Sequence, residues 1–347
     1  MTESTFYSDR AGRGKPRVSE IISNEAWVGL TALIQQRIND GSLARAFPQY
    51  ACPDDPGRNT ITGTNEENFL RSLKAHIPAL SEPQPTPNEE HGVEREGLFG
   101  SWSSTERPRV HPPRSPLDLE EAPDAATSLD IVDFVAIHID QPTYRSSHDW
   151  GFDHVHYSFR DHQHDPFSGT ELTPGQAQFQ RDVDLLFARN GIAYTVGDDM
   201  RVRRLGPLEA RPLIAEFRPS TGDVLLDGKL QDAMARFLSR DLADRRDSLE
   251  KLWDAFERMK TLELGAGSLK KPSANQLLTR AASGSEAFRE LLEAEFKTLT
   301  GIGNRFSIRH HEHDQDDVPT GAAVDYLFVR LASLVSVILR HTGRMSS

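Results

Sequence analysis

The segment of the chain best equipped for chemistry is GIGNRFSIRHHEHDQDD, residues 301–317. It contains Arg305 and His310 in an R-x4-H spacing, and a second histidine, His311, follows directly. A histidine can take the proton of a ribose 2′-OH or give one to a leaving oxygen, and an arginine fork can stabilise charge on phosphoryl oxygens. These residue types therefore suit RNA cleavage without a metal. The spacing alone is more typical of a loop of salt bridges, because chance produces it often.

The geometry of this spacing limits how the two side chains can meet. Residues five apart lie about 140° apart around a regular helix. Arg305 and His310 therefore converge only if the turn is irregular, if the long arginine reaches round, or if a second subunit supplies one of them. The glycines at positions 301 and 303 are typical of a turn.

A second polar cluster, HDWGFDHVHYSFRDHQHD at residues 148–165, holds five of the thirteen histidines. Imidazole and carboxylate groups are competent ligands of zinc, manganese or iron. On a strand, His154 and His156 would share one face. The spacing matches no metal motif, which favours structural or solvated histidines. A metal-dependent hydrolase and recognition of a partner or nucleotide are the alternatives.

Composition narrows the class of protein. The 347 residues predict about two domains. The net charge of −12 argues against a protein that coats nucleic acid through bulk charge, although it does not exclude a local RNA site. The single cysteine, Cys52, excludes an intramolecular disulfide framework and a Cys-rich zinc site. So low a cysteine content is typical of proteins in a reducing cytoplasm. No uninterrupted run approaches the ~18 apolar residues of a membrane span, and the N-terminal residues carry no apolar secretion signal.

The N-terminal part of the chain, residues 1–220, is predicted to be a mixed α+β domain with a Pro-rich insertion at 81–126. Eight prolines in that insertion predict a loop or linker. The residues around Gly197-Asp198-Asp199 predict a small β-hairpin. The apolar segment 128–139 favours a helix over a strand. The periodicity predicts further helices over 17–37, 65–76 and 174–190.

Residues 221–347 are predicted to form a helical bundle, which makes the chain mainly α. The last segment is apolar nearly all round, as expected of a central bundle helix or a dimer face. The predicted helices span 226–239, 243–262, 273–282, 285–298 and 322–341.

Several segments resemble known families. A helical C-terminal module whose polar Arg/His turn precedes a final apolar helix resembles the HEPN superfamily. More closely, IRHHE followed by VDYLFVRLASLVSVILR resembles the C-terminal domain of AbiJ-type abortive-infection proteins. The segment FYSDRAGRGKPRVSEIISNEAWVGLTALI is similar to the start of the N-terminal domain of those proteins, and FQRDVDLLFARNGIAYTVGDDMRVRRL resembles its helix and hairpin. Together these segments cover about 1–45, 175–215 and 240–345.

The resemblance implies a cytoplasmic endoribonuclease toxin of a bacterial antiphage defence system, with an N-terminal regulatory or sensor domain. Arg305 and His310 match the R-x4-H motif, with His311 as the substitute for His310, and Asn304 and Arg309 are the expected RNA contacts. The family implies cleavage that leaves a 2′,3′-cyclic phosphate, needs no metal or other cofactor, and is often completed across a homodimer.

The expected partners are therefore the RNA substrate, a second copy of the chain, and an antitoxin or a phage-derived trigger, with no membrane. One residue departs from the family pattern, because Phe306 stands where HEPN motifs often have Asn, Asp or His. That departure keeps open a non-catalytic dimerisation or sensor protein as the alternative.

Overall fold

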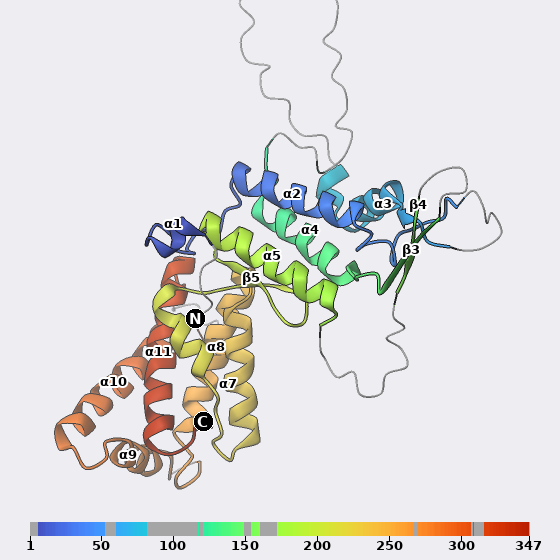
Figure 1. Ribbon diagram of the computed structural model, residues 1–347. Helices are drawn as coiled ribbons and strands as arrows, with labels where there is room; N and C mark the ends of the chain where they lie inside the picture. Colours follow the sequence, from blue (N-terminus) through green and yellow to red (C-terminus); the bar gives the residue numbers. More distant parts are fainter. Residues whose placement is uncertain are drawn as a thin grey trace, which may run out of the picture. The chain divides into compact units, whose positions relative to one another are not determined.

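The computed structural model describes residues 6–52, 60–81, 117, 121–148, 154–159, 172–266, 269–306, 308 and 316–346. The chain divides into two compact units, residues 1–202 (unit 1) and 203–347 (unit 2). It is mainly helical, with small two-stranded antiparallel sheets and a helical C-terminal half (Figure 1). This confirms the predicted fold class.

Unit 1 is organised around helix α5, which packs against α2 and α4 (Figure 1). Side-chain caps fix where these helices begin, as in the Thr173–Gln176 capping box of α5, and Gly191 ends α5 in the left-handed conformation. Trp27 and Phe179 are fully buried in the shared core. The helices of unit 1 are α1 (Tyr7–Arg10), α2 (Asn24–Asn39), α3 (Glu66–His76), α4 (Ala125–His138) and α5 (Pro174–Asn190), with a 3-10 turn at Pro78–Ser81.

Within the part of the chain that the structure describes, the strands form three two-stranded ribbons. The strands are β1 (Pro48–Gln49), β2 (Gly63–Thr64), β3 (Tyr144–His148), β4 (His154–Ser158), β5 (Tyr194–Val196) and β6 (Val202–Arg204). A bridge joins Ile61, just before β2, to Tyr157 of β4, and the Tyr157 N–H donates to the Ile61 carbonyl at 2.8 Å. The predicted hairpin is β5–β6. The sequence did not predict β1–β2 or β3–β4, because these strands are short and carry few branched apolar residues.

Two predicted boundaries in unit 1 were wrong in instructive ways. The helix expected from residue 17 begins at Asn24, because Ser23 caps it and Ser19 instead pairs with Ile192 in extended backbone. The Pro-rich insertion, expected to reach residue 126, gives way to α4 at Ala125, because Asp124 caps that helix. Residues 82–116 and 118–120 of that insertion lie outside the described residues.

Unit 2 is a bundle in which α8 packs against α7 and α11, and α9 packs against α10 and α11. A single apolar cluster fills its interior, with Phe237 stacked on Phe328 at a ring-centroid distance of 3.9 Å. Its helices are α6 (Arg211–Glu216), preceded by a 3-10 turn at Leu208–Ala210, α7 (Val224–Phe237), α8 (Leu242–Met259), α9 (Lys270–Ala281), α10 (Glu286–Arg305) and α11 (Gly321–His341).

Helix α10 is longer than the sequence predicted. The expected end was residue 298, whereas the helix continues to Arg305. Gly301 and Gly303 were interpreted as turn residues but lie within the helix. Arg305 is therefore the last residue of a helix rather than part of a polar connection, and this correction matters for the site below.

Helix α11 is the central helix that its sequence predicted. It is the one helix among the described residues with the length and apolar composition to cross a membrane. Residues such as Leu331, Val335 and Ile338 are fully buried in unit 2. Burial in the bundle core thus explains the apolar composition of α11.

A buried ion pair anchors α11 within unit 2. Arg204 donates to both carboxylate oxygens of Asp325, one at 3.2 Å, and the two side chains are 7% and 11% exposed. A second cation lies close by, since burial and then the charge of Arg204 lower the pKa of Arg211. The carboxylate of Asp325 therefore offsets positive charge that the core cannot solvate.

Replacing Asp325 with Asn should destabilise the protein by about 3–5 kcal/mol, because it leaves a buried guanidinium opposite a neutral amide. The matched control is Glu67→Gln, which breaks the exposed i,i+4 pair with Arg71 and should cost at most about 1 kcal/mol. Chemical denaturation followed by circular dichroism measures both losses. Similar small losses in the two variants would contradict the role assigned to the buried pair.

Candidate active site at the end of helix α10

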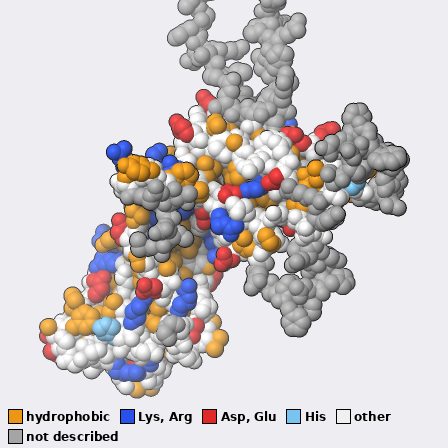
Figure 2. All heavy atoms as spheres, viewed as in Figure 1, with side chains coloured by type: hydrophobic (Ala, Val, Ile, Leu, Met, Phe, Trp, Pro, Cys, Tyr) orange, Lys and Arg blue, Asp and Glu red, His pale blue; other side chains and the backbone are white. Residues whose placement is uncertain are grey.

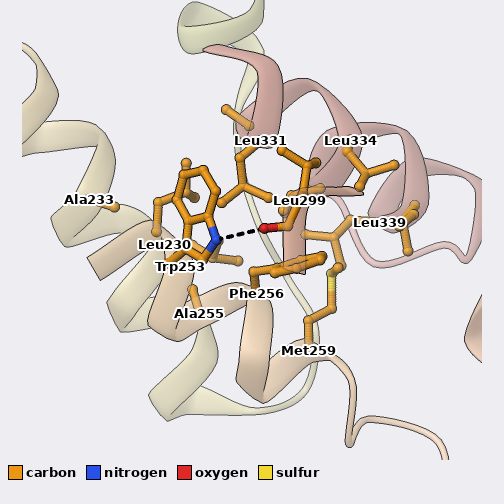
Figure 3. Close-up of a cluster of buried hydrophobic side chains, with 14 of the residues drawn as sticks. Leu230, Ala233, Trp253, Ala255, Phe256, Met259, Leu299, Leu331, Leu334 and Leu339 are labelled. Carbon is orange, nitrogen blue, oxygen red and sulfur yellow. Dashed lines mark hydrogen bonds between the residues drawn. The ribbon is translucent and has the colours of Figure 1, made fainter. Parts of the chain in front are cut away.

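Trp253 of α8 fixes the position of the last two turns of α10. Its indole Nε1 donates a hydrogen bond to the Leu299 carbonyl at 3.2 Å, and the side chain is buried in the bundle core (Figure 3). A Cβ atom at Gly303 would fall well inside van der Waals contact of the indole Nε1 and Cδ1. The ring thus occupies the space of a side chain, and only glycine allows α10 to lie this close to α8.

The chain leaves helical geometry directly after Arg305. Phe306 is the C-cap in extended conformation, and its N–H donates to the Ile302 carbonyl at 3.0 Å. Phe306 is half-buried against the core of unit 2, and Ile308 is only 5% exposed within that core. These two apolar residues anchor the turn. The irregular backbone is the first of the conditions under which an R-x4-H pair can converge.

The side chains of Asn304 and Arg305 both face solvent at this helix end. Arg305 Nε lies 3.4 Å from an Asp316 oxygen, and the two side chains are 76% and 64% exposed. The Asp316 N–H donates to the Arg305 carbonyl at 3.2 Å, which holds these two residues together. An ion pair this exposed contributes at most about 1 kcal/mol. Arg305 can therefore exchange Asp316 for a phosphate at little cost.

Arg309, His310 and His311, the other predicted site residues, lie outside the described residues. The structure does place the two ends of their segment. Arg305 and Phe306 stand on one side, and Asp316 pairs with Phe306 on the other. The proposed roles of the two histidines and of Arg309 stay predictions.

Helix α8 brings two arginines to this end of the bundle that the sequence analysis missed. Arg246 and Glu250 line a pocket of about 240 Å³ together with Ile308 and Asp317, which flank the loop. Arg245 is buried, and its guanidinium reaches the start of α11. Its Nη2 atom lies 3.5 Å from the point where a Cβ atom added to Gly321 would stand. The local sequence around these two arginines does not predict their place near the turn, because α8 and the residues that it meets there are far apart in the chain.

The charges around this pocket are mixed rather than basic. Asp247, a third acidic lining residue beside Glu250 and Asp317, forms an ion pair with Arg236 at 2.6 Å. The hydrogen bond to Asp232, with the charges of Asp232 and Asp247, raises the pKa of Arg236. Arg236 therefore stays cationic and offsets one of the carboxylates. Figure 2 likewise shows Lys and Arg interspersed with Asp and Glu on the visible face.

The start of α11 adds a further favourable group. This helix begins at Gly321, capped by the Thr320 hydroxyl, which accepts from the Ala323 N–H at 3.1 Å. The backbone N–H groups at the start of a helix carry a partial positive charge that attracts anions. Arg246 lines the pocket beside the turn, whereas Arg305 is exposed at the end of α10 and is not among the residues that line this pocket.

The second sequence cluster is partly described, in unit 1. His154 and His156 lie on β4, so their alternate positions place them on one face of a strand, and their ring centroids are 4.9 Å apart.

Unit 1 also has an open groove of about 610 Å³ between α2 and α5, with Phe6 and Arg189 at one end. Arg189 stacks on the Phe6 ring at 3.9 Å.

No family model matches this chain, and the comparisons with curated proteins and with solved structures gave no match either. Function must therefore be inferred from the residues at the α10–α11 turn and from the sequence segments named at the start.

Two glycine substitutions in α10 should have opposite effects on stability. Gly303→Ala forces the new methyl group against the Trp253 indole and should cost about 1–3 kcal/mol. Gly301→Ala meets nothing within 4 Å and should stabilise the helix by about 0.5–1 kcal/mol. Urea denaturation of the two variants measures the difference. Equal effects would show that Trp253 does not hold the end of α10.

Proposed function

We propose that this chain is a HEPN-type, metal-independent endoribonuclease toxin of a bacterial abortive-infection defence system. The observation that carries the proposal is the turn between α10 and α11. Arg305, the last residue of α10 before this turn, is exposed and only weakly paired at the end of a helix that Trp253 holds in place. The segment that follows contains the histidines of the R-x4-H pattern.

Each group has a distinct role in the proposed reaction. Arg305 binds the phosphoryl oxygens and stabilises the charge that builds on them. His310, or His311 in its place, takes the proton of the 2′-OH and returns one to the 5′ oxygen that leaves. The 2′ oxygen forms a bond to phosphorus as the bond to the 5′ oxygen breaks, which leaves a 2′,3′-cyclic phosphate. Asn304 and Arg309 contact the RNA backbone beside the scissile bond.

The charge distribution favours a selective enzyme over a general RNA-binding protein. The chain carries a net charge of −12, and acidic residues line the pocket beside the turn. Long-range attraction of RNA is therefore weak, and binding relies on the few cations at the turn. Such an enzyme cleaves only an RNA whose phosphates can reach these few cations. This fits a cytoplasmic toxin that unit 1, an antitoxin or a phage-derived trigger controls.

Phe306 favours the second candidate function, a non-catalytic HEPN-like dimerisation or sensor protein. Its side chain packs against the core of unit 2 and offers no polar group to a substrate. The family often has a polar residue at this position. The test below separates the two candidates, because only the enzyme cleaves RNA.

The enzymatic proposal predicts that Arg305→Ala slows RNA cleavage by about 10²–10³-fold, and that His310→Ala or His311→Ala slows it by about 10²–10⁴-fold. Cleavage of total RNA by the purified full chain is measured in EDTA, in parallel with toxicity on induction in cells. Arg71→Ala, which removes an arginine of comparable exposure in unit 1, should leave both unchanged.

Full cleavage and toxicity in Arg305→Ala and in both histidine variants would overturn the assignment of this site. A wild-type protein that cleaves no RNA with or without phage infection would favour the non-catalytic candidate.

We also propose that the protein is a homodimer, as its resemblance to the HEPN superfamily implies. An apolar groove of about 450 Å³ runs between α10 and α11, and Leu291 on its edge is 61% exposed. Apolar grooves that open to solvent can mark interaction sites. A second copy of the chain bound there would join the two helices that flank the proposed active site of each subunit.

Leu291→Asp should convert a dimer to a monomer, because it places a charge in the apolar contact. Light scattering after gel filtration measures the mass. Leu269→Asp is the matched control, since Leu269 is 48% exposed and is not among the residues that line the groove. A Leu291→Asp protein that stays dimeric would contradict this dimer face.

A further inference from the structure

Unit 1 contains a cluster of three metal-binding side chains that the proposed ribonuclease chemistry does not use. Cys52 lies just beyond β1, and His154 and His156 lie on β4. The Nε2 atom of His154 is 3.0 Å from Nε2 of His156 and 3.3 Å from Sγ of Cys52. All three ligand atoms lie within 4.8 Å of one another.

The backbone of unit 1 explains why these side chains converge. Alternation along β4 places both histidines on one face. The bridge between Ile61 and Tyr157 ties β4 to the chain just before β2. Next to it, the Thr62 hydroxyl accepts a hydrogen bond at 3.1 Å from the N–H of Ala51, the neighbour of Cys52. Two sequence regions separated by about a hundred positions are thereby held side by side.

The spacing of the three atoms is close to that of ligands around one ion. In a tetrahedral zinc site the bonds are ≈ 2.0–2.1 Å to nitrogen and ≈ 2.3 Å to sulfur, which places two nitrogens about 3.3 Å apart and a nitrogen and a sulfur about 3.6 Å apart. The two observed distances, 3.0 and 3.3 Å, are each shorter by only about 0.3 Å. Small side-chain adjustments would therefore admit the ion.

Hydrogen bonding alone is a poor explanation of this arrangement. A ring nitrogen has either one N–H or one lone pair, directed along a single line in the ring plane. Nε2 of His154 lies within hydrogen-bond distance of both the His156 nitrogen and the Cys52 sulfur, so its one N–H or lone pair is shared between two neighbours. A cation placed among the three atoms receives one lone pair from each of them.

We infer that Cys52, His154 and His156 bind one zinc ion. A thiolate with two imidazoles is a donor set that zinc takes up readily. Binding replaces the thiol proton of Cys52, which passes to solvent. Cys52 is only 8% exposed and the two histidines are half-buried, so the ion is partly shielded from water. A water molecule can complete a tetrahedral site that has three protein ligands.

The ion would act as a cross-link in unit 1. It joins the segment after β1 to β4, next to the Ile61–Tyr157 bridge that already ties β4 to the chain before β2. Closing so long a segment of chain with a metal reduces the entropy of the unfolded state. This role is independent of the ribonuclease proposal, because the ligands belong to unit 1 and the proposed catalytic residues to unit 2.

The first test uses the untagged, full-length protein stripped of metal and then loaded with zinc. Elemental analysis after gel filtration should give about one zinc per chain. X-ray absorption should show one sulfur at about 2.3 Å and nitrogen or oxygen ligands at about 2.0–2.1 Å. Less than one zinc per several chains, or zinc bound without sulfur, would overturn the inference.

The second test replaces single ligands and follows cobalt, which reports on zinc sites through its colour. Wild-type protein should show a thiolate-to-cobalt charge-transfer band, and Cys52→Ser should lose it. His154→Ala and His156→Ala should each weaken cobalt binding at least tenfold, whereas His76→Ala, an exposed histidine outside the cluster, should not. Circular dichroism establishes that each variant is folded. Unchanged cobalt binding in a folded histidine variant would exclude that residue as a ligand and contradict the three-ligand site.

Discussion

The contact between Trp253 and α10 is the constraint on which the rest of the proposed site depends. The indole donates to the Leu299 carbonyl (Figure 3), and it occupies the space that a side chain at position 303 would need. It thereby fixes the axis of α10 two residues before Arg305. Without it, the arginine would stand on a helix end free to shift against α8. The chemistry attributed to the turn needs a cation held within a fraction of an ångström, which a rigid helix provides better than a loop.

The same contact shows why the sequence predicted the elements better than the site. The bounds of α5 and α11 follow from local sequence, because each helix has a periodic apolar stripe and begins directly after a capping threonine, Thr173 or Thr320. The end of α10 was mispredicted because glycine is usually read as a breaker. Gly303 is there for a tertiary reason, the indole of a residue on another helix, and no local pattern carries that information.

Long-range partners limited the prediction of chemistry in a similar way. Arg246 of α8 and Cys52 of unit 1 each meet their neighbours through contacts between positions far apart in the chain. The R-x4-H segment and the histidines of β4 are visible in the sequence because those residues are clustered along the chain. A single cysteine, Cys52, does exclude a Cys-rich zinc site. A mixed Cys-His-His set becomes visible only when the fold brings the residues together.

In the proposed mechanism the neighbouring 2′-OH, rather than water, attacks the RNA phosphate, and the chemistry of the RNA ends tests this most directly. Purified full-length protein is incubated with RNA in EDTA, and the new ends are mapped by sequencing and by their reactivity to kinase and phosphatase. We expect a 2′,3′-cyclic phosphate on one fragment and a 5′-hydroxyl on the other. A 5′-phosphate with a 3′-hydroxyl, formed only when a metal ion is supplied, would contradict it.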